Sequence, residues 1–464
     1  MKYISTRGEA PPRDFLDVLL SGTAPDGGLY MPEAWPRLSA PQIARFSRLS
    51  YEEVALEILF PFVEGTFSRE ELASDIAAAY RTFDTRSIVP VVPLGRDLNL
   101  IELFHGPTFA FKDIALQLLA QLIARGLAKR GETATIVVAT SGDTGAAAVA
   151  ALGGLKNIEL FVLHPAGRVS EIQRRQMTTS GHENVHNLAL TGTFDDAQAI
   201  VKGLFADVVF ARRLKLMAVN SINLARILIQ SVYYFTSAAV LRTPGVFAVP
   251  TGNFGDVFAG EAATRMGLPI EKLLVATNAN DIMVRTLNDG IHAVGETIPT
   301  LSPAMDIQIA SNFERALFEA AGRDTVVVRT LLGANNRRLQ IPASLLSNLQ
   351  VRYSANRASD QETLATIRLF RDETGRVVDP HTAVALAAAR KTGAREGTPM
   401  AVLSTAHPAK FPEAVEAALG EKTLLPERLS NLLSKAEKVA ALEPKLPLVR
   451  AYIEARLAHH ESGN

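Results

Sequence analysis

The chain has 464 residues, of which 47 % are hydrophobic, and it carries 48 basic and 48 acidic side chains. This length suits two or three domains, and a net charge of zero gives no global field that would favour nucleic acid or an anionic membrane as a partner. No cysteine is present, which excludes disulfides, thiolate zinc sites and thiol nucleophiles.

The first 95 residues are predicted to form a mainly helical region. Apolar residues at helical spacing predict short helices over 15–20 and 51–60, and the capping box SREE at 68–71 opens another helix. The opening residues MKYISTRG have no apolar signal core, and no uninterrupted apolar run is long enough to span a bilayer. We therefore expect a cytoplasmic protein without a membrane partner.

From about residue 97, short apolar strands alternate with helices. The predicted strands are 98–103, 135–139, 159–163, 245–249, 272–276 and 401–404, and the predicted helices between them are 111–127, 145–152 and 169–178. This alternation is typical of an α/β fold whose parallel sheets are covered by helices on both faces. Residues 311–375 are more charged and less regular, so we expect an insertion there. An apolar face over 429–439 predicts a late helix, and a last helix is expected to end near residue 460.

Two glycine-containing loops each follow a predicted strand and open a helix. They are ATSGDTG at 139–145 and TGNFGD at 251–256. Backbone N–H groups at such a helix start bind a phosphate or a carboxylate, and Thr140, Ser141 and Thr144 add hydroxyl donors. For the first loop alone, simple capping of the helix by Ser141 or Asp143 explains the pattern equally well. The second loop alone could be just a tight turn into a helix. Because ligands collect at the carboxyl ends of parallel strands, the two loops together favour a binding site.

Two further segments carry polar groups of the same kind. In NSINLAR at 220–226, Ser221 and Asn223 can cap a helix, and Arg226 lies one turn later as a bidentate partner for phosphate or carboxylate. A surface arginine on a capped helix is the alternative. In LSTAHPAKF at 403–411, a hydroxyl pair precedes His407, which suits either a general base or a structural residue. The histidines have no metal-binding spacing, so no metal is expected.

Lys112 lies in HGPTFAFKD at 105–113, directly before an apolar helical stretch. Most lysines are solvated surface residues. Here Phe109, Phe111 and Ile114 surround the amine, and partial burial would lower its pKa and make it a nucleophile. A nucleophilic lysine followed by two anion-binding loops suggests a Schiff base with an aldehyde cofactor, pyridoxal 5'-phosphate (PLP).

With these segments in place, the chain resembles the threonine synthases, a family of fold type II PLP enzymes. The matching segments follow the family's order and are PDGGL (25–29), HGPTFAFKD (105–113), TSGDTG (140–145), NSIN (220–223), GNFGD (252–256), TN and ND (277–281), PAMD (303–306) and TAHPAKF (405–411). The region before Lys112 resembles the longer subgroup found in many bacteria and fungi. The resemblance implies two parallel-type twisted sheets flanked by helices, together with the mainly helical N-terminal region.

The resemblance also implies a role for each candidate residue. Lys112 matches the Schiff-base lysine and the catalytic base. The cofactor would be held by Gly252, Asn253, Phe254, Gly255 and Asp256 at its phosphate, by Thr405 at the pyridine nitrogen, and by Asp143, where many relatives carry Asn near the 3′-oxygen. The substrate would be held by Thr140, Ser141, Thr144, Ser221 and Arg226.

The implied reaction converts O-phospho-L-homoserine and water into L-threonine and phosphate by γ-elimination and β-hydration. A related fold type II lyase, either a phospho-lyase or a dehydratase, is the alternative, and a non-catalytic anion-binding α/β protein is a third reading. The expected domains are 1–95, a large PLP-binding domain of 96–124 and 236–464, and a smaller mobile domain of 125–235. The oligomeric state is open between monomer and dimer.

Overall fold

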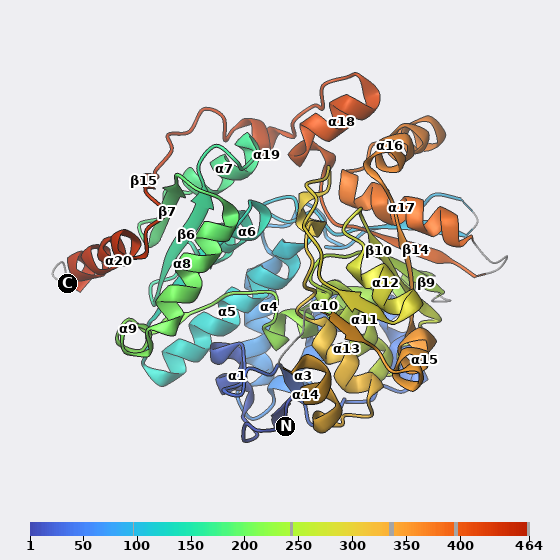
Figure 1. The fold of residues 1–464 in the computed structure, drawn as a ribbon, viewed down its shortest axis with the longest axis horizontal. Coiled ribbons are helices and arrows are strands. Elements are labelled where there is room, and N and C mark those ends of the chain that lie inside the picture. Colours follow the sequence, from blue (N-terminus) through green and yellow to red (C-terminus); the bar gives the residue numbers. More distant parts are fainter. Residues whose placement is uncertain (96, 242–244, 334–337, 394–397, 462–464) are drawn as a thin grey trace. The chain divides into compact units, whose positions relative to one another are not determined.

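The structure, a computed structural model, describes residues 1–461 except 96, 242–244, 334–337 and 394–397. Two compact units make up the protein, and each is described by itself. The first unit comprises Met1–Leu119 and Ser221–Leu424, and the second comprises Ala120–Asn220 and Leu425–Asn464. Helix α5 (Lys112–Arg130) begins in the first unit and ends in the second (Figure 1).

The first unit begins with a small N-terminal part and continues with alternating strands and helices. Its N-terminal elements are β1 (Tyr3–Ser5), α1 (Phe15–Ser21), β2 (Tyr30–Pro32), α2 (Ala40–Arg45), η1 (Phe46–Arg48), α3 (Tyr51–Val63), α4 (Arg69–Tyr80), β3 (Val91–Pro93) and β4 (Leu98–Glu102). After the second unit the chain returns with α10 (Leu224–Leu241), β9 (Val246–Pro250), α11 (Gly255–Arg265), β10 (Lys272–Thr277), α12 (Ile282–Asp289), β11 (Ile291–Ala293) and η2 (Pro303–Met305). The remaining elements are α13 (Phe313–Ala320), α14 (Thr325–Leu332), β12 (Arg338–Gln340), α15 (Ala343–Arg352), β13 (Tyr353–Arg357), α16 (Asp360–Thr374), α17 (Pro380–Thr392), β14 (Met400–Ser404), η3 (Pro408–Lys410) and α18 (Pro412–Leu419).

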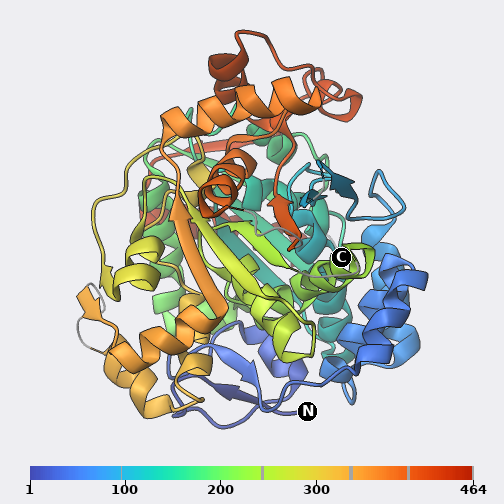
Figure 2. The ribbon, with the colours of Figure 1, turned by 90° about the vertical axis from the view of Figure 1, so that its right-hand side faces the viewer.

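A twisted sheet forms the centre of this unit, with six strands among the described residues in the order β13-β10-β9-β14-β4-β3. Every neighbouring pair is parallel except β3 with β4. In Figure 2 the orange strand β13 lies beside the yellow-green β10. Because β4, β14, β9 and β10 are parallel, the loops that follow them leave the sheet at one edge.

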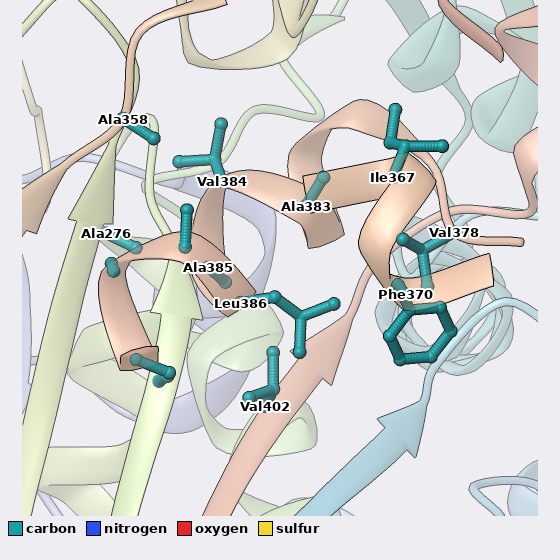
Figure 3. Close-up of a cluster of buried hydrophobic side chains, with 14 of the residues drawn as sticks. Ala276, Ala358, Ile367, Phe370, Val378, Ala383, Val384, Ala385, Leu386 and Val402 are labelled. Atoms are coloured by element: carbon teal, nitrogen blue, oxygen red, sulfur yellow. The ribbon is translucent and has the colours of Figure 1, made fainter. Parts of the chain in front are cut away.

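Helix α17 covers one face of this sheet and contacts β9, β10, β13 and β14. Its run of buried alanines lets the helix approach the strands closely, and α16 packs against its other side. Figure 3 shows Val402 of β14 next to Leu386 of α17, with Ile367, Phe370 and Val378 grouped to their right. Helices α11 and α12 also contact β10. Helices on both faces are usual for a mainly parallel sheet.

The helices predicted for the N-terminal region are confirmed as α1, α3 and α4. Ser68 and Glu71 form the predicted capping box: the Ser68 hydroxyl accepts from the Glu71 amide at 3.2 Å, and the Glu71 carboxylate accepts from the Ser68 amide at 2.8 Å. Ser50 and Glu53 form a second capping box at the start of α3. Local hydrogen bonding therefore fixes these helix starts.

The second unit contains a parallel sheet whose described strands have the order β15-β7-β6-β5-β8. Its elements are β5 (Ala134–Ala139), α6 (Asp143–Leu152), β6 (Ile158–Pro165), α7 (Glu171–Thr178), β7 (Val185–Leu190), α8 (Phe194–Ala206), α9 (Val208–Arg213), β8 (Leu216–Met217), α19 (Glu427–Ser430), β15 (Ala440–Leu442) and α20 (Leu446–Glu461). One face packs against α8 and α20, through Leu204 and Ile453 among others.

The helix predicted over 429–439 is wrong. Helix α19 ends at Ser430, and the chain then runs as turns to β15, which pairs with β7. The amide of Lys438 donates to the carbonyl oxygen of Thr178 at 2.7 Å, so this segment lies across the end of α7 instead of forming its own helix. Leu433 and Val439, which defined the apolar face, are exposed.

The compact units differ from the expected boundaries in several places. Residues 1–95 and 221–235 group with the first unit, and residues 120–124 and 425–464 group with the second, whose sheet receives β15. The segment 311–375 is not set apart from the sheet, because β13 pairs with β10 along its whole length. The mobility of the smaller domain stays a prediction.

Helix α10 is long and apolar enough to cross a membrane, with a mean hydropathy of 1.3. However, 78 % of it is buried inside the protein, as in a core helix. Arg226 lies in its first turn and is itself buried.

Candidate active site

The loop after β4 and the loop after β14 are joined backbone to backbone. The amide of Phe111 donates to the carbonyl oxygen of Thr405 at 2.8 Å, and the amide of His407 donates to the carbonyl oxygen of Phe109 at 3.1 Å. Ala110 and Ala406 form an antiparallel bridge between these two bonds. The two loops therefore bring the backbone of Lys112 close to that of Thr405, as expected for loops that leave adjacent parallel strands.

Lys112 is the first residue of α5 and is half-buried. Its Nζ lies 5.5 Å from the ring centroid of Phe111, within the range of a cation–π contact. Phe109 has a positive φ of 59°, a left-handed conformation that turns the chain sharply before the helix begins. This turn presents the lysine at the edge of the sheet.

A buried carboxylate braces the same turn. The side chain of Asp113 accepts from the Thr108 amide at 2.8 Å and from the Thr108 hydroxyl at 2.6 Å. Burial raises the pKa of Asp113 to about 6, although those bonds and the charge of Lys410 oppose the rise. Lys410, fully buried, donates to the carbonyl oxygen of Thr108 at 2.8 Å. A side chain at Gly106 would meet Asp113 at 2.4 Å, which explains the glycine.

The loop after β9 turns directly into α11. Phe254 has a positive φ of 67°, and the Asn253 side-chain oxygen accepts from the Gly255 amide at 3.0 Å, so the turn is closed by local contacts. Within the described part of the chain, the amides of Gly252, Asn253 and Phe254 donate to no other residue. Three N–H groups at a helix N-terminus, next to a glycine that leaves the backbone accessible, form an anion-binding cradle.

Two tyrosines of α10 hold Asp256 of this loop by hydrogen bonds. The hydroxyl of Tyr233 donates to Asp256 Oδ1, and the hydroxyl of Tyr234 donates to the Asp256 carbonyl oxygen at 2.9 Å. Burial raises the pKa of Asp256 to about 7, against the lowering effect of the tyrosine hydrogen bonds. The carboxylate thus faces the protein interior and supports the loop, and it is not part of the amide cradle of Gly252, Asn253 and Phe254.

The turn that precedes α10 lies next to this loop. The side-chain amide of Asn312 donates to the carbonyl oxygens of Ser221 and Asn253, at 3.1 and 3.2 Å. Arg226 follows in the first turn of α10 with only 4 % of its surface exposed, and its Nε atom has no hydrogen-bond partner among the described residues. Burial lowers the pKa of Arg226 to about 10. A buried cation with an unused donor is suited to an anionic ligand.

The remaining predicted residues lie in the second unit, at the start of α6. The Thr140 hydroxyl accepts from the amides of Gly142 and Gly145, each at 2.9 Å, so it closes the loop. The Asp143 carboxylate accepts from the side chain of Gln173 at 2.9 Å. Ser141 is exposed and Thr144 is half-buried. This loop therefore has the predicted form of a helix-start anion site.

The structure favours a packing role for His407. Its Nδ1 accepts from the Ala409 amide at 3.1 Å, and its ring packs edge-on to Phe104 and Phe109, with centroids 5.5 Å away in each case. Burial lowers the pKa of His407, because it disfavours the charged ring. Among the described residues, no cluster of three or more His, Asp or Glu side chains has a geometry that could hold a metal.

Sequence reasoning missed four residues that support the loop before α11 and the turn before α10, the two anion-binding segments of the first unit. They are Asn312, Arg315, Tyr233 and Tyr234. Asn312 lies in a segment that looked irregular, and the tyrosines resembled ordinary apolar positions of a core helix. A buried arginine such as Arg315 has no pattern that distinguishes it from a surface arginine. The one signal in the sequence was the run NFER at 312–315, whose polar residues are typical of a helix start.

Family models cover most of the chain. Residues 2–80 match the model described as threonine synthase N terminus, residues 94–331 match pyridoxal-phosphate dependent enzyme, and residues 382–453 match threonine synthase, C-terminal. The threonine synthase of Pseudomonas aeruginosa is 45 % identical over 98 % of both chains. The chain belongs to the threonine synthase family.

Solved structures of this family have the same fold. The PLP-bound threonine synthase of Brucella melitensis is 49 % identical, with a TM-score of 0.96 over 98 % of this chain and 99 % of that one. The yeast threonine synthase is 38 % identical, with a TM-score of 0.94 over 99 % of each chain. The predicted fold type II architecture is therefore confirmed.

The residues present fit the cofactor of the threonine synthase family. A cradle of main-chain amides at Gly252–Phe254 suits its phosphate, and a Cβ on Gly252 would lie 2.6 Å from the carbonyl oxygen of Ala304, so the backbone there is closely confined. Lys112 supplies a primary amine at the same sheet edge. Thr405, on the loop that is bonded to the Lys112 loop, supplies a buried hydroxyl.

Proposed function

We propose that the protein binds PLP and converts O-phospho-L-homoserine and water into L-threonine and phosphate. One observation carries the proposal. The loops after β4, β14 and β9 bring three groups to one edge of the central sheet, namely an amine, a hydroxyl and an amide cradle. The turn before α10, which is followed by the buried Arg226, lies next to the cradle. These groups supply one site for a covalent cofactor and places for two phosphates.

PLP, when bound, withdraws negative charge from the α-carbon of an amino-acid substrate. Lys112 would hold the cofactor through its amine. The same amine, when free, would be the base that takes the proton from the α-carbon of the substrate. Lys112 is half-buried, and its amine lies over the ring of Phe111.

Thr405 and the cradle orient the cofactor. A hydroxyl at the pyridine nitrogen is neutral, so it does not enforce a protonated ring as a carboxylate would. The amides of Gly252, Asn253 and Phe254 bind the cofactor phosphate together with the positive end of α11. Both contacts fix the reacting carbon relative to Lys112.

The substrate brings a second phosphate, which departs from the γ-carbon. Arg226 can donate to it through its unused Nε, and Ser221 adds a hydroxyl at the same turn. Thr140, Ser141 and Thr144 are proposed to bind the substrate carboxylate. A buried cation at the leaving group stabilises the charge that develops there.

The test is an assay of phosphate release and threonine formation, with and without added PLP. We expect both products from the unmodified protein, and we expect Lys112→Ala to lose the visible absorbance of the bound cofactor and all turnover. Lys129→Ala is the matched control, because Lys129 is an exposed lysine at the other end of α5. An unmodified protein that takes up no PLP would contradict the proposal.

Product identity separates this function from that of a related phospho-lyase or dehydratase. Release of phosphate with a 2-oxoacid instead of threonine would assign the lyase reaction. The cytoplasmic location, the absence of nucleic-acid and membrane partners, and a monomeric or dimeric state stay predictions. Cell fractionation and light scattering test the first and the last of them.

A further inference from the structure

Asn312 and Arg315, at the start of α13, are fully buried, each with 0 % of its surface exposed. Asn312 directly joins the two anion-binding segments of the first unit. Its side-chain amide donates to Ser221 and Asn253 carbonyl oxygens, and its main-chain amide donates to the Asn253 carbonyl oxygen at 3.0 Å. One residue therefore holds the turn before α10 and the loop before α11 at a fixed separation.

Arg315 fixes the orientation of Asn312 and holds a third carbonyl. It donates through Nη1 to the Asn312 side-chain oxygen and through Nη2 to the Ile222 carbonyl oxygen at 2.7 Å. Its Nε donates to the carbonyl oxygen of Tyr30 in β2, at 3.2 Å. Because a guanidinium can only donate, the Asn312 oxygen must face Arg315, and its NH₂ group must face the two loops.

These contacts determine where the loop amides point. In a planar trans peptide the C=O of one residue and the N–H of the next point in opposite directions. The carbonyls of Ser221, Ile222 and Asn253 all face α13. The N–H groups of the residues that follow them, Ile222, Asn223 and Phe254, are therefore directed away from α13.

We propose that Asn312 and Arg315 are positioning residues that set the distance between the cofactor-phosphate cradle and the turn that receives the phosphate of the substrate. A substrate bound covalently through its amine has its γ-phosphate at a set reach from the cofactor. A fixed spacing between the two anion sites then selects a phosphorylated substrate of that length. This inference rests on the proposed function, since it assigns the second site to the substrate.

The bond from Arg315 to Tyr30 also connects α13 to the N-terminal region. Glu314, between the two positioning residues, accepts from the Thr6 hydroxyl at 2.5 Å and from Arg7 Nη2 at 3.0 Å. These bonds join the first turn of α13 to the N-terminal part of the chain, and none of them involves the two loops.

The decisive variant is Asn312→Asp in the PLP-loaded enzyme. Aspartate has nearly the same shape and still accepts from Arg315, but its ionised carboxylate cannot donate to the two carbonyls. We expect KM for O-phospho-L-homoserine and the Kd of inorganic phosphate each to rise about tenfold or more, with a smaller change in kcat. Arg315→Lys, which keeps the cation but loses the planar fork, should raise both constants in the same direction.

Two controls separate positioning from general loss of stability. Asn348→Asp makes the same substitution in α15, where Asn348 donates to the carbonyl oxygen of Ala320, the last residue of α13, at 2.9 Å. Thr6→Val removes a buried hydrogen bond to Glu314 without touching either loop. The largest effect expected of either variant is a lower thermal midpoint. Both variants should leave KM and the phosphate Kd unchanged.

Unchanged KM and phosphate Kd in Asn312→Asp and in Arg315→Lys would overturn the inference. An equal rise in Thr6→Val would overturn it as well, because a general loss of packing would then explain the effect. Calorimetry with inorganic phosphate does not depend on turnover. If the unmodified enzyme fails to convert O-phospho-L-homoserine, the proposed function fails while the phosphate titration still decides the role of Asn312.

Discussion

The amide of Phe111 donates a 2.8 Å hydrogen bond to the carbonyl oxygen of Thr405. This bond joins two loops that are nearly three hundred residues apart in the chain, and each loop carries a residue proposed to act on the cofactor. Because Lys112 directly follows Phe111, the geometry of the reactive amine depends on the loop after β14.

Thr405→Val should weaken PLP binding about tenfold, the effect of one lost hydrogen bond to a polar group, without changing the fold. Valine has almost the same shape as threonine, and the main-chain bond to Phe111 is kept. Titration of the cofactor-free enzyme with PLP measures the change. Ser404→Ala is the matched control, because the neighbouring Ser404 hydroxyl lies 3.1 Å from the hydroxyl of Thr382. Equal PLP affinity in Thr405→Val and the unmodified enzyme would rule out the contact.

Gly252→Ala should abolish binding of the cofactor phosphate. The added Cβ would lie 2.6 Å from the carbonyl oxygen of Ala304, so the loop must move and the amide cradle must open. Gly295→Ala serves as the control, since its Cβ would meet nothing closer than 3.8 Å. PLP retention after gel filtration measures both variants, and retention by Gly252→Ala would show that the cradle tolerates the shift.

Arg226→Met should stabilise the protein while it weakens phosphate binding. Burial of a cation with an unused donor is unfavourable, and methionine fills a similar volume without that cost. The thermal midpoint in phosphate-free buffer should rise, and KM for the phosphorylated substrate should rise steeply. Arg69, also in the first turn of a helix but partly exposed, is the control, and Arg69→Met should change neither quantity much. A fall in the midpoint of Arg226→Met would indicate that the arginine already has its partner within the protein.

Asp256→Asn should remove a pH dependence of stability. Burial raises the pKa of Asp256 from 3.8 to about 7, so the folded state binds the proton more tightly than the unfolded state does. The free energy of unfolding therefore falls as pH rises from about 4 to about 7, by roughly 4 kcal/mol at most, and is flat above that range. Asparagine still accepts from Tyr233 and carries no charge.

The measurement is the thermal midpoint of both cofactor-free proteins across this pH range. The thermal midpoint of Asp256→Asn, relative to that of the unmodified protein, should rise as pH rises. Parallel curves for the two proteins would show that Asp256 does not titrate there.

Local signals in the sequence were sufficient for part of the structure. The capping box at Ser68 and Glu71 depends on four consecutive residues, and the Gly252–Asp256 loop depends on a strand, a glycine turn and a helix start, so both could be predicted. The helix expected over 429–439 failed because its apolar spacing competed with pairing of β15 to β7, a contact between segments far apart in sequence. Asn312 and Arg315 could not be assigned, because the carbonyl oxygens they hold come from three distant segments.

Strand β14 lies between β4 and β9 although it is the last strand of that sheet to be synthesised. Until residues 400–404 leave the ribosome, the two strands that precede Lys112 and the phosphate cradle have no neighbour between them. Long-range pairing of this kind is slow, and it is completed late in folding. The reactive amine therefore gains its partner loop only when almost the whole chain exists, so a truncated or nascent chain has no assembled site in which to bind the cofactor.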